Sequence, residues 1–337
     1  SDHSVFIEKY IENPKHIEKS ELANYRHYLE RLQDEYPHTL PENEENLIVD
    51  KDQYGVNAWA TLQSQWLNTR EMEVEVEGEK KVLSYGEANG LLSHPDKATR
   101  KSANKSIYSK LGEDEMIFST ALRNVCSDWV KTYKRRKFDS PMGQSLLAND
   151  LDKTTIMNLM NTVKANAGIY QDYLQHKAKL MELPKLGCED VIAPLSSDEN
   201  IATDWDSAKD LILTAYGNFD PEVQEFVKMM YTQNQIDASP RHGKRNGAFC
   251  SGWPKGKSAF VLMSFNNAMN DMYTLAHELG HAVHDNYLYR SQTLLNTNLS
   301  MCVAETASIF GELLLTDKKK KKMDDESKKQ QILAHVL

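Results

Sequence analysis

The sequence has few cysteines and no long apolar run. Its four cysteines form no CxxC pair, so we expect them to be reduced, buried thiols: Cys126, Cys188, Cys250 and Cys302. No stretch approaches the roughly 20 apolar residues that a membrane-spanning helix needs. We therefore expect no membrane-spanning helix and no membrane partner. The first twenty residues are polar and charged, unlike a secretory signal, so we expect a cytoplasmic protein.

An excess of basic residues is also missing. The 40 lysines and arginines are outnumbered by 49 acids, which gives a formal net charge of -9. A nucleic-acid-binding surface normally needs a basic footprint, so we expect no nucleic-acid partner. No cysteine or serine stands in a recognisable nucleophile motif, which argues against serine or cysteine peptidase chemistry.

Helical periodicity dominates what is present. Apolar residues recur at helical spacing among charges, as in amphipathic helices. The pattern predicts helices over about 5–35, 115–136, 153–166, 169–182, 206–216 and 221–231. The segment Ser93–Asp96 has the form of a capped helix start. We therefore predict a mainly α fold.

Two places break the helical pattern. Residues 73–83 alternate between polar and apolar and turn at Gly78, which predicts a β-hairpin. Residues 246–250 and 258–265 are short, bounded by glycine or proline, and rich in strand-forming residues. They predict a short β-sheet just before the next motif.

The segment Thr274–His284 contains HExxH on a predicted helix. His277 and His281 are four residues apart, so they lie on one helix face about 6 Å apart along the axis. Two imidazoles at this separation can converge on one zinc ion. Glu278 lies about 100° around the helix, where it can take a proton from a zinc-bound water.

Two further residues of this helix need an explanation. Gly280 costs roughly 1 kcal/mol relative to alanine inside a helix, which a close approach of another segment would explain. His284 shares the stripe of the two histidines but lies about 10.5 Å along the axis from His277. We expect His284 to contact the ligand residues from outside the metal site or to face the substrate. The alternative is an ordinary histidine packed in the protein interior.

Two histidines leave a catalytic zinc one protein ligand short. Downstream, Glu305 and Glu312 are seven residues apart and share one helix face among apolar residues. A carboxylate in apolar surroundings is costly unless it is paired or bound to metal. Glu305 is the better ligand candidate, and Glu312 could hold a zinc-bound imidazole. For Glu312 an exposed position is the alternative.

The motif and its spacing resemble oligoendopeptidase F, of the thimet-oligopeptidase-like zinc metallopeptidases. Glu305 follows His281 by 24 residues in an Ala-Glu-Thr-Ala-Ser context. Other segments fall in the family's order, and the likeness covers nearly the whole chain from about residue 20: His38–Glu42, the Trp59 region, the 73–83 hairpin, Arg100–Ala103 and Gly243–Cys250.

The resemblance implies a helical metallopeptidase with a deep channel, zinc on its floor, and short unfolded peptides as substrates. It implies His277, His281 and Glu305 as zinc ligands and Glu278 as general base. In that family a strand beside the zinc helix pairs with the substrate backbone.

In this chain the corresponding substrate-binding residues are Gly247, Ala248 and Phe249. The resemblance also implies a helical amino-terminal lobe with the hairpin, residues 1–90, and a catalytic domain, residues 91–337. The family's catalytic region continues further and supplies a His and a Tyr that polarise the scissile carbonyl. Here His335 lies in no matching context, so we expect an interior fragment with a shortened lobe and doubtful activity on its own.

Two functions are consistent with these residues. The first is a zinc endopeptidase that hydrolyses short peptides by attack of a zinc-bound water, with Glu278 as base. The alternative is a helical peptide-binding protein that retains zinc without turnover. The sequence does not indicate an oligomeric state.

Overall fold

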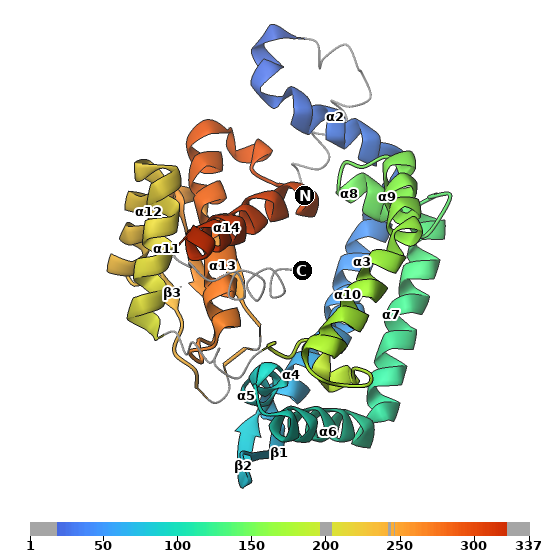
Figure 1. Ribbon diagram of the computed structural model, residues 1–337. Coiled ribbons are helices and arrows are strands. Elements are labelled where there is room, and N and C mark those ends of the chain that lie inside the picture. Colours follow the sequence, from blue (N-terminus) through green and yellow to red (C-terminus); the bar gives the residue numbers. More distant parts are fainter. Residues whose placement is uncertain (1–18, 196–203, 242–243, 246, 322–337) are drawn as a thin grey trace. The chain divides into compact units, whose positions relative to one another are not determined.

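The computed structural model describes residues 19–195, 204–241, 244–245 and 247–321 (Figure 1). This part of the chain is mainly helical with two small β-sheets, which confirms the predicted fold class. No helix within it is long and apolar enough to cross a membrane. The chain divides into two compact units, namely Ser1–Gln63, Met116–Thr162 and Leu288–Val303, and Ser64–Glu115, Val163–Tyr287 and Ala304–Leu337. The expected channel and the boundary near residue 90 stay predictions.

The first unit is built of helices. They are η2 (Ser20–Tyr25), α2 (Arg26–Glu35), η3 (Tyr36–His38), α3 (Glu42–Tyr54), part of α4 (Val56–Thr69), α7 (Glu115–Arg135), α8 (Gly143–Ala148), most of α9 (Lys153–Ala165) and η8 (Leu294–Asn296). Of the helix predicted over 5–35, residues 5–18 lie outside the described residues and the rest forms η2 and α2. Arg136, just after α7, donates hydrogen bonds of 2.6 and 2.7 Å to the Glu45 carboxylate of α3.

The cysteines depart from the prediction. All four are free, as expected, but the prediction of burial is wrong for three of them. Cys126, Cys188 and Cys302 are exposed, and Cys250 is partly buried. Cys126 lies on α7, a helix without any fully buried residue. An amphipathic pattern does not reveal how completely a neighbouring element covers a helix face, and here the cover is partial.

The predicted hairpin is present in the second unit. Strands β1 (Glu71–Val76) and β2 (Glu79–Ser84) pair antiparallel. Glu77 and Gly78 between them both have positive φ, 51° and 88°, which is the geometry of a type I′ turn. The strands lead into α5 (Tyr85–Gly90) and η4 (Leu91–Ser93). The buried face of the hairpin joins a cluster of Met72, Val74, Ala88, Ala103 and Ile107.

Helix α6 (Lys97–Glu113) begins later than the sequence suggests. Its N-cap is Asp96, whose carboxylate accepts the backbone N–H of Thr99 at 2.8 Å. Ser93 ends η4 instead, so the predicted cap at Ser93 is wrong. The reason is Pro95, because a residue before proline is held extended, and His94 has φ -65° and ψ 141°.

A buried ion pair joins α6 to η5 (Cys188–Asp190). Arg100 and Asp190 are 2% and 0% exposed, and their side chains lie 2.8 Å apart. Lys97 donates a second hydrogen bond to Asp190, at 2.9 Å. Lys177 of α10 (Ala167–Leu180) is buried nearby and donates to the carbonyl of Val191 at 2.8 Å. The three buried charged groups of Arg100, Asp190 and Lys177 therefore each have a hydrogen-bond partner, which offsets the cost of their burial.

The largest core lies where helices cover a three-stranded sheet. Its strands β3 (Ile236–Asp237), β5 (Ser258–Leu262) and β4 (Phe249–Trp253) are arranged in that order, with η7 (Pro254–Gly256) between β4 and β5. β3 is parallel and β4 antiparallel to β5. The sheet was predicted, but β4 ends at residue 253 rather than 250 and β5 stops at 262. β3 was missed, since two residues are too few to show a period.

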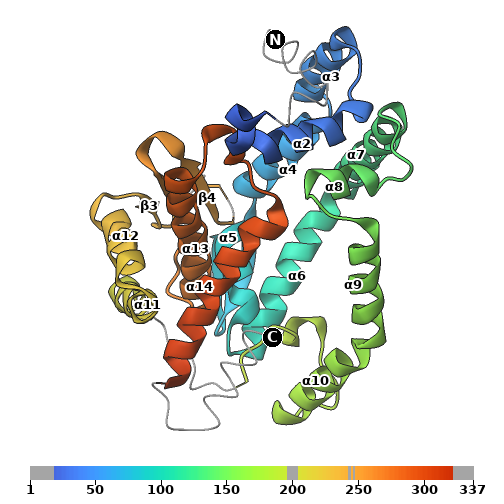
Figure 2. The same ribbon diagram turned by 90° about the horizontal axis from the view of Figure 1, so that it is seen from above.

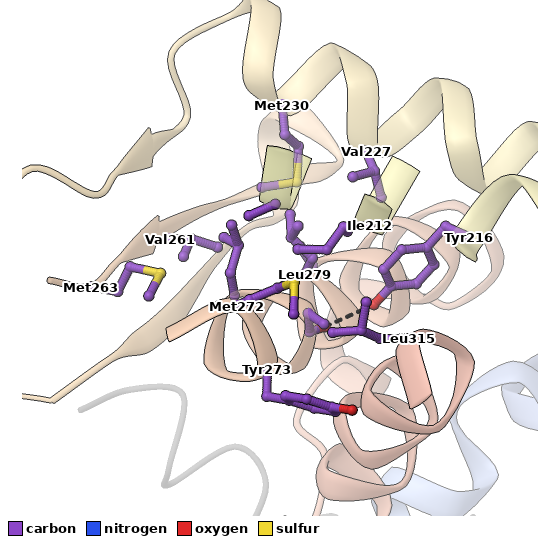
Figure 3. Packing of buried hydrophobic residues seen from close by; sticks show 14 of the residues in the cluster. Ile212, Tyr216, Val227, Met230, Val261, Met263, Met272, Tyr273, Leu279 and Leu315 are labelled. Atoms are coloured by element: carbon purple, nitrogen blue, oxygen red, sulfur yellow. Dashed lines mark hydrogen bonds between the residues drawn. The ribbon is translucent and has the colours of Figure 1, made fainter. Parts of the chain in front are cut away.

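Four helices complete this core, namely α11 (Trp205–Phe219), α12 (Pro221–Thr232), α13 (Met269–Ser291) and α14 (Met301–Lys321), seen together in Figures 1 and 2. Figure 3 shows how their apolar side chains meet around Leu279. Fully or almost fully buried members include Ile212, Val227, Met230, Val261, Met272, Leu279 and Leu315. At about 1.5–3 kcal/mol for each large buried side chain, this packing fixes α13 and α14 firmly.

Candidate metal centre

The HExxH residues and the two downstream glutamates meet between α13 and α14. His277 and His281 extend from α13, with ring centroids 4.9 Å apart and planes at 83°. From α14, Oε2 of Glu305 lies 3.3 Å from Nε2 of His277 and 3.7 Å from Nε2 of His281. One potential ligand atom of each residue lies within 4.8 Å of the others. The described part of the chain contains no second cluster of this kind.

Two glycines allow the helices to come this close. A Cβ on Gly280 would lie 2.5 Å from the carbonyl oxygen of Ala307 and 2.7 Å from Cα of Ser308. A Cβ on Gly311 would lie 2.6 Å from the carbonyl oxygen of Ala276 and closer still to the hydroxyl of Tyr216. The close approach expected at Gly280 is therefore confirmed, and its neighbour is the backbone of α14.

Tyr216 adds a contact that the sequence did not reveal. Its hydroxyl donates a 2.8 Å hydrogen bond to the carbonyl of Ala276, drawn as the dashed line in Figure 3. Ala276 directly precedes His277, so α11 contacts α13 next to the first candidate ligand. Burial raises the pKa of Tyr216, which keeps the hydroxyl protonated and able to donate.

Each candidate ligand is oriented by a hydrogen bond. Nδ1 of His277 lies 2.6 Å from Oε1 of Glu312, so its N–H faces the carboxylate and Nε2 faces Glu305. The hydroxyl of Ser308 donates to Oε2 of Glu305 at 2.8 Å. His281 bonds to the backbone of Ala304, and burial lowers its pKa. A neutral imidazole is the form that binds metal.

Glu278 lies beside this group and is only 6% exposed. Burial raises the pKa of its carboxyl group, His277 opposes this, and the Glu305 carboxylate reinforces it. The backbone N–H of Cys250 in β4 donates a hydrogen bond to the Glu278 carboxylate. A buried carboxylate with a raised pKa is a stronger base, which is what proton abstraction near neutral pH needs.

The remaining predicted residues lie outside the cluster. His284 is half-buried on α13, burial lowers its pKa, and it does not belong to the group of converging ligand atoms. Gly247 has φ 81°, in the left-handed region that favours glycine. It leads through Ala248 into Phe249, the first residue of β4. Among the described residues β4 pairs with β5 on one side only.

One assumption about α14 was wrong. The sequence suggested that apolar residues surround Glu305 and Glu312, but Val303, Ile309 and Phe310 are 49%, 52% and 42% exposed. The Glu305 side chain is itself 44% exposed. Its position is therefore explained by its hydrogen bond with Ser308 and its closeness to the histidines rather than by burial.

The donor set fits a zinc ion. Two imidazole nitrogens and one carboxylate oxygen are the ligands of catalytic zinc sites that keep one position open. The hydrogen-bonded carboxylate behind His277 is also a usual partner of a zinc-bound imidazole. The same ligand types can hold other first-row metals, so this donor set is compatible with zinc but not exclusive to it.

Comparison with known proteins places this geometry in context. Residues 218–337 match the model of Peptidase family M3, and residues 7–68 match the model named Oligopeptidase F. The chain is 28% identical to the oligopeptidase PepF of Bacillus subtilis, covering 95% of this chain and 48% of that protein. It is 27% identical to an oligoendopeptidase F homolog of Borreliella burgdorferi, covering 89% and 51%. The chain thus spans about half the length of the curated relatives it matches.

Solved structures share the fold. An oligoendopeptidase-F from Enterococcus faecium superimposes with a TM-score of 0.61 at 22% identity, over 99% of this chain and 52% of that one. PZ peptidase A, solved with an inhibitor, gives a TM-score of 0.75 at 16% identity, over 94% and 55%. At these identities the likeness establishes the arrangement of helices and strands.

Proposed function

This chain belongs to peptidase family M3, among the oligoendopeptidase F proteins. From that premise we propose that it carries the catalytic centre of a zinc-dependent endopeptidase that acts on short unfolded peptides. The observation that carries the proposal is the convergence of His277, His281 and Glu305 with Glu278 beside them. We also propose a cytoplasmic location, supported by four free thiols.

The residues have distinct roles in this proposal. His277, His281 and Glu305 would hold the zinc ion. When bound, zinc supplies Lewis-acid chemistry that makes a water more acidic and a carbonyl more electrophilic. Glu278 accepts the proton of the attacking water and passes it to the leaving amine, because it is a buried carboxylate that interacts electrostatically with His277 and Glu305.

Peptide binding is assigned to the free edge of β4. A peptide that adds as a strand at Gly247, Ala248 and Phe249 uses backbone hydrogen bonds, so it can have almost any sequence. The guanidinium of Arg245 lies 5.2 Å from the ring centroid of Phe249 and supports this end of the strand. His284, on the stripe of the two histidines, is proposed to face the substrate or support the ligands.

The test measures metal content and peptide hydrolysis on the same purified protein. We expect about one zinc per chain. Any cleavage of a quenched peptide, by this chain or by a longer form that contains it, should stop on chelation and return with zinc. The matched control is Glu278→Gln, which fills the same space and should keep the metal but lose turnover. Zinc and peptide binding without any cleavage would instead support a peptide-binding protein. Cleavage that survives complete metal removal would refute the proposal.

A further inference from the structure

Lys244 is a buried lysine with an unusual set of acceptors. Its side chain is 2% exposed. The ammonium group donates three hydrogen bonds, each 3.0 Å long, to the backbone carbonyl of Asp237, the carboxylate of Asp237 and the backbone carbonyl of Ser239. An ammonium group has three protons, so all of them are used. Burial of a charge is costly unless it is paired in this way.

The carboxylate of Asp237 accepts hydrogen bonds from both Lys244 and Arg241, and these three residues form one charged cluster. Arg241 donates two hydrogen bonds to the Asp237 carboxylate, at 2.8 and 2.6 Å. Together with Lys244 these hold the pKa of Asp237 well below its usual range. Asp237 is also the last residue of β3, and its carbonyl accepts the backbone N–H of Met263 at 3.0 Å. The cluster is therefore joined to the sheet itself.

The chain between β3 and β4 connects this cluster to the candidate catalytic base. Lys244 lies five residues before Phe249, where β4 begins. The next residue, Cys250, donates its backbone N–H to the Glu278 carboxylate. It also pairs with Val261 of β5. A shift of the segment before β4 would therefore move both the proposed peptide-binding edge and the hydrogen bond to Glu278.

A purely space-filling role does not explain these contacts. A methionine or leucine would fill the same volume without the cost of burying a charge. It would, however, remove one of the two donors that each of the Asp237 and Ser239 carbonyls has now, together with the positive charge that pairs with the Asp237 carboxylate. Lys244 therefore fixes the path of the chain in a way that an apolar residue cannot.

We propose that Lys244 is a positioning residue for peptide hydrolysis. By tying its loop to Asp237 and Ser239 it sets the place of β4, and through the backbone N–H of Cys250 it sets the place of the Glu278 carboxylate. This inference rests on the proposed endopeptidase function, because it assigns Lys244 a part in that reaction.

The test uses Lys244→Met and Lys244→Arg in the full chain, with Lys228→Met as matched control. Lys228 is exposed on α12 in an ion pair with Glu225. Hydrogen–deuterium exchange of the amides over 247–253 is measured beside kcat and KM at equal zinc content. In Lys244→Met we expect faster exchange in β4, unchanged exchange in α13, a raised KM, and kcat/KM lower by on the order of 10- to 100-fold. Lys244→Arg should restore part of each change, and Lys228→Met should match the wild type.

The rise in KM separates positioning from simple loss of folded protein, which lowers the active fraction and leaves KM unchanged. Wild-type exchange in β4 of Lys244→Met would overturn the inference, whether or not the protein hydrolyses peptides. If Lys244→Met loses protection in α13 as well, Asp237→Asn serves instead, with Arg241→Met as its control. Asp237→Asn keeps the backbone carbonyl and removes the charge that Lys244 and Arg241 share, and Arg241→Met removes the Arg241 contacts alone. If the wild type itself cleaves nothing, the proposed function fails, and the exchange of β4 still decides the role of Lys244 in placing that strand.

Discussion

The Nδ1 atom of His277 and Oε1 of Glu312 lie 2.6 Å apart, on two different helices. This contact fixes the ring so that Nε2 faces the carboxylate of Glu305, 3.3 Å away. The imidazole of His277 thus lies between two carboxylates, with Glu312 at Nδ1 and Glu305 at Nε2. Such a carboxylate behind a ligand histidine usually raises its basicity and restricts its rotation.

Removal of the carboxylate behind His277 should weaken metal binding. We expect Glu312→Ala to lower zinc affinity by roughly 10- to 100-fold, because the imidazole loses its orientation. Glu312→Gln, which can still accept the N–H, should fall between this variant and the wild type. Competition with a zinc chelator measures the affinities. Wild-type affinity in Glu312→Ala would show that the contact is dispensable.

Removal of the proposed third ligand should have a larger effect. Glu305→Ala should reduce zinc affinity more than Glu312→Ala does, while helix content stays near that of the wild type. His284→Ala is the comparison variant, since it removes a neighbouring histidine outside the converging group, and its effect should be smaller than that of Glu305→Ala. Metal analysis and circular dichroism on the three proteins give the answer. The assignment is wrong if zinc binding survives in Glu305→Ala and is lost in His284→Ala.

The close contact of α13 and α14 predicts a cost for any side chain at Gly280. Gly280→Ala should destabilise the protein by about 1–3 kcal/mol, because the added carbon meets backbone atoms that cannot move aside. Gly112→Ala is a matched change on α6, where nothing lies within 4 Å. It should be neutral or stabilise by up to about 1 kcal/mol. Urea denaturation of both variants tests the difference, and equal stabilities would contradict it.

The Arg100–Asp190 pair predicts a defined pH dependence. Burial raises the pKa of Asp190, but hydrogen bonds from Arg100 and Lys97 outweigh it and hold the pKa at about 2. A carboxyl whose pKa is lowered by folding stabilises the protein above its unfolded pKa of about 3.9, and this stabilisation is lost as pH falls toward 2.

Asp190→Asn should therefore cost about 3–5 kcal/mol at pH 7, since it leaves Arg100 buried without a counter-charge. The difference from the wild type should shrink between pH 4 and pH 2. Glu113→Gln, in an exposed pair with Lys110, should change stability by less than about 1 kcal/mol. Denaturation curves at pH 7 and pH 3 suffice, and a constant difference would disprove the role of the ion pair.

The sequence predicted the local parts of the centre well. The HExxH motif identified His277, Glu278 and His281, and helix periodicity puts the two histidines on one face, because four residues make about one turn. Glu305 lies on another helix, and its position came from its spacing and the family resemblance. That spacing could not give the distance between α13 and α14, which depends on Gly280 and Gly311 meeting backbone atoms.

Contacts between distant side chains and the backbone were beyond the reach of the sequence. The hydroxyl of Tyr216 donates to the backbone carbonyl of Ala276, and the ammonium group of Lys244 donates to the backbone carbonyl of Asp237. Neither hydrogen bond leaves a periodic pattern in the sequence. The exposure of Cys126 was missed for a related reason, since the burial of a helix face depends on its neighbours.

The glycine contacts between α13 and α14 have a consequence for how this centre can change. The spacing of the helices is set by main-chain atoms, which remain when a ligand side chain is replaced. Ligand chemistry and helix spacing are therefore separable properties. In the proposed zinc site, a change of Glu305 to aspartate or histidine would alter the reach and charge of one donor, and with them the preferred metal, without a change in the backbone contacts of the two glycines. Metal preference can thus diverge among proteins of this fold by single substitutions, while any gain of bulk at the two glycines would alter every ligand at once.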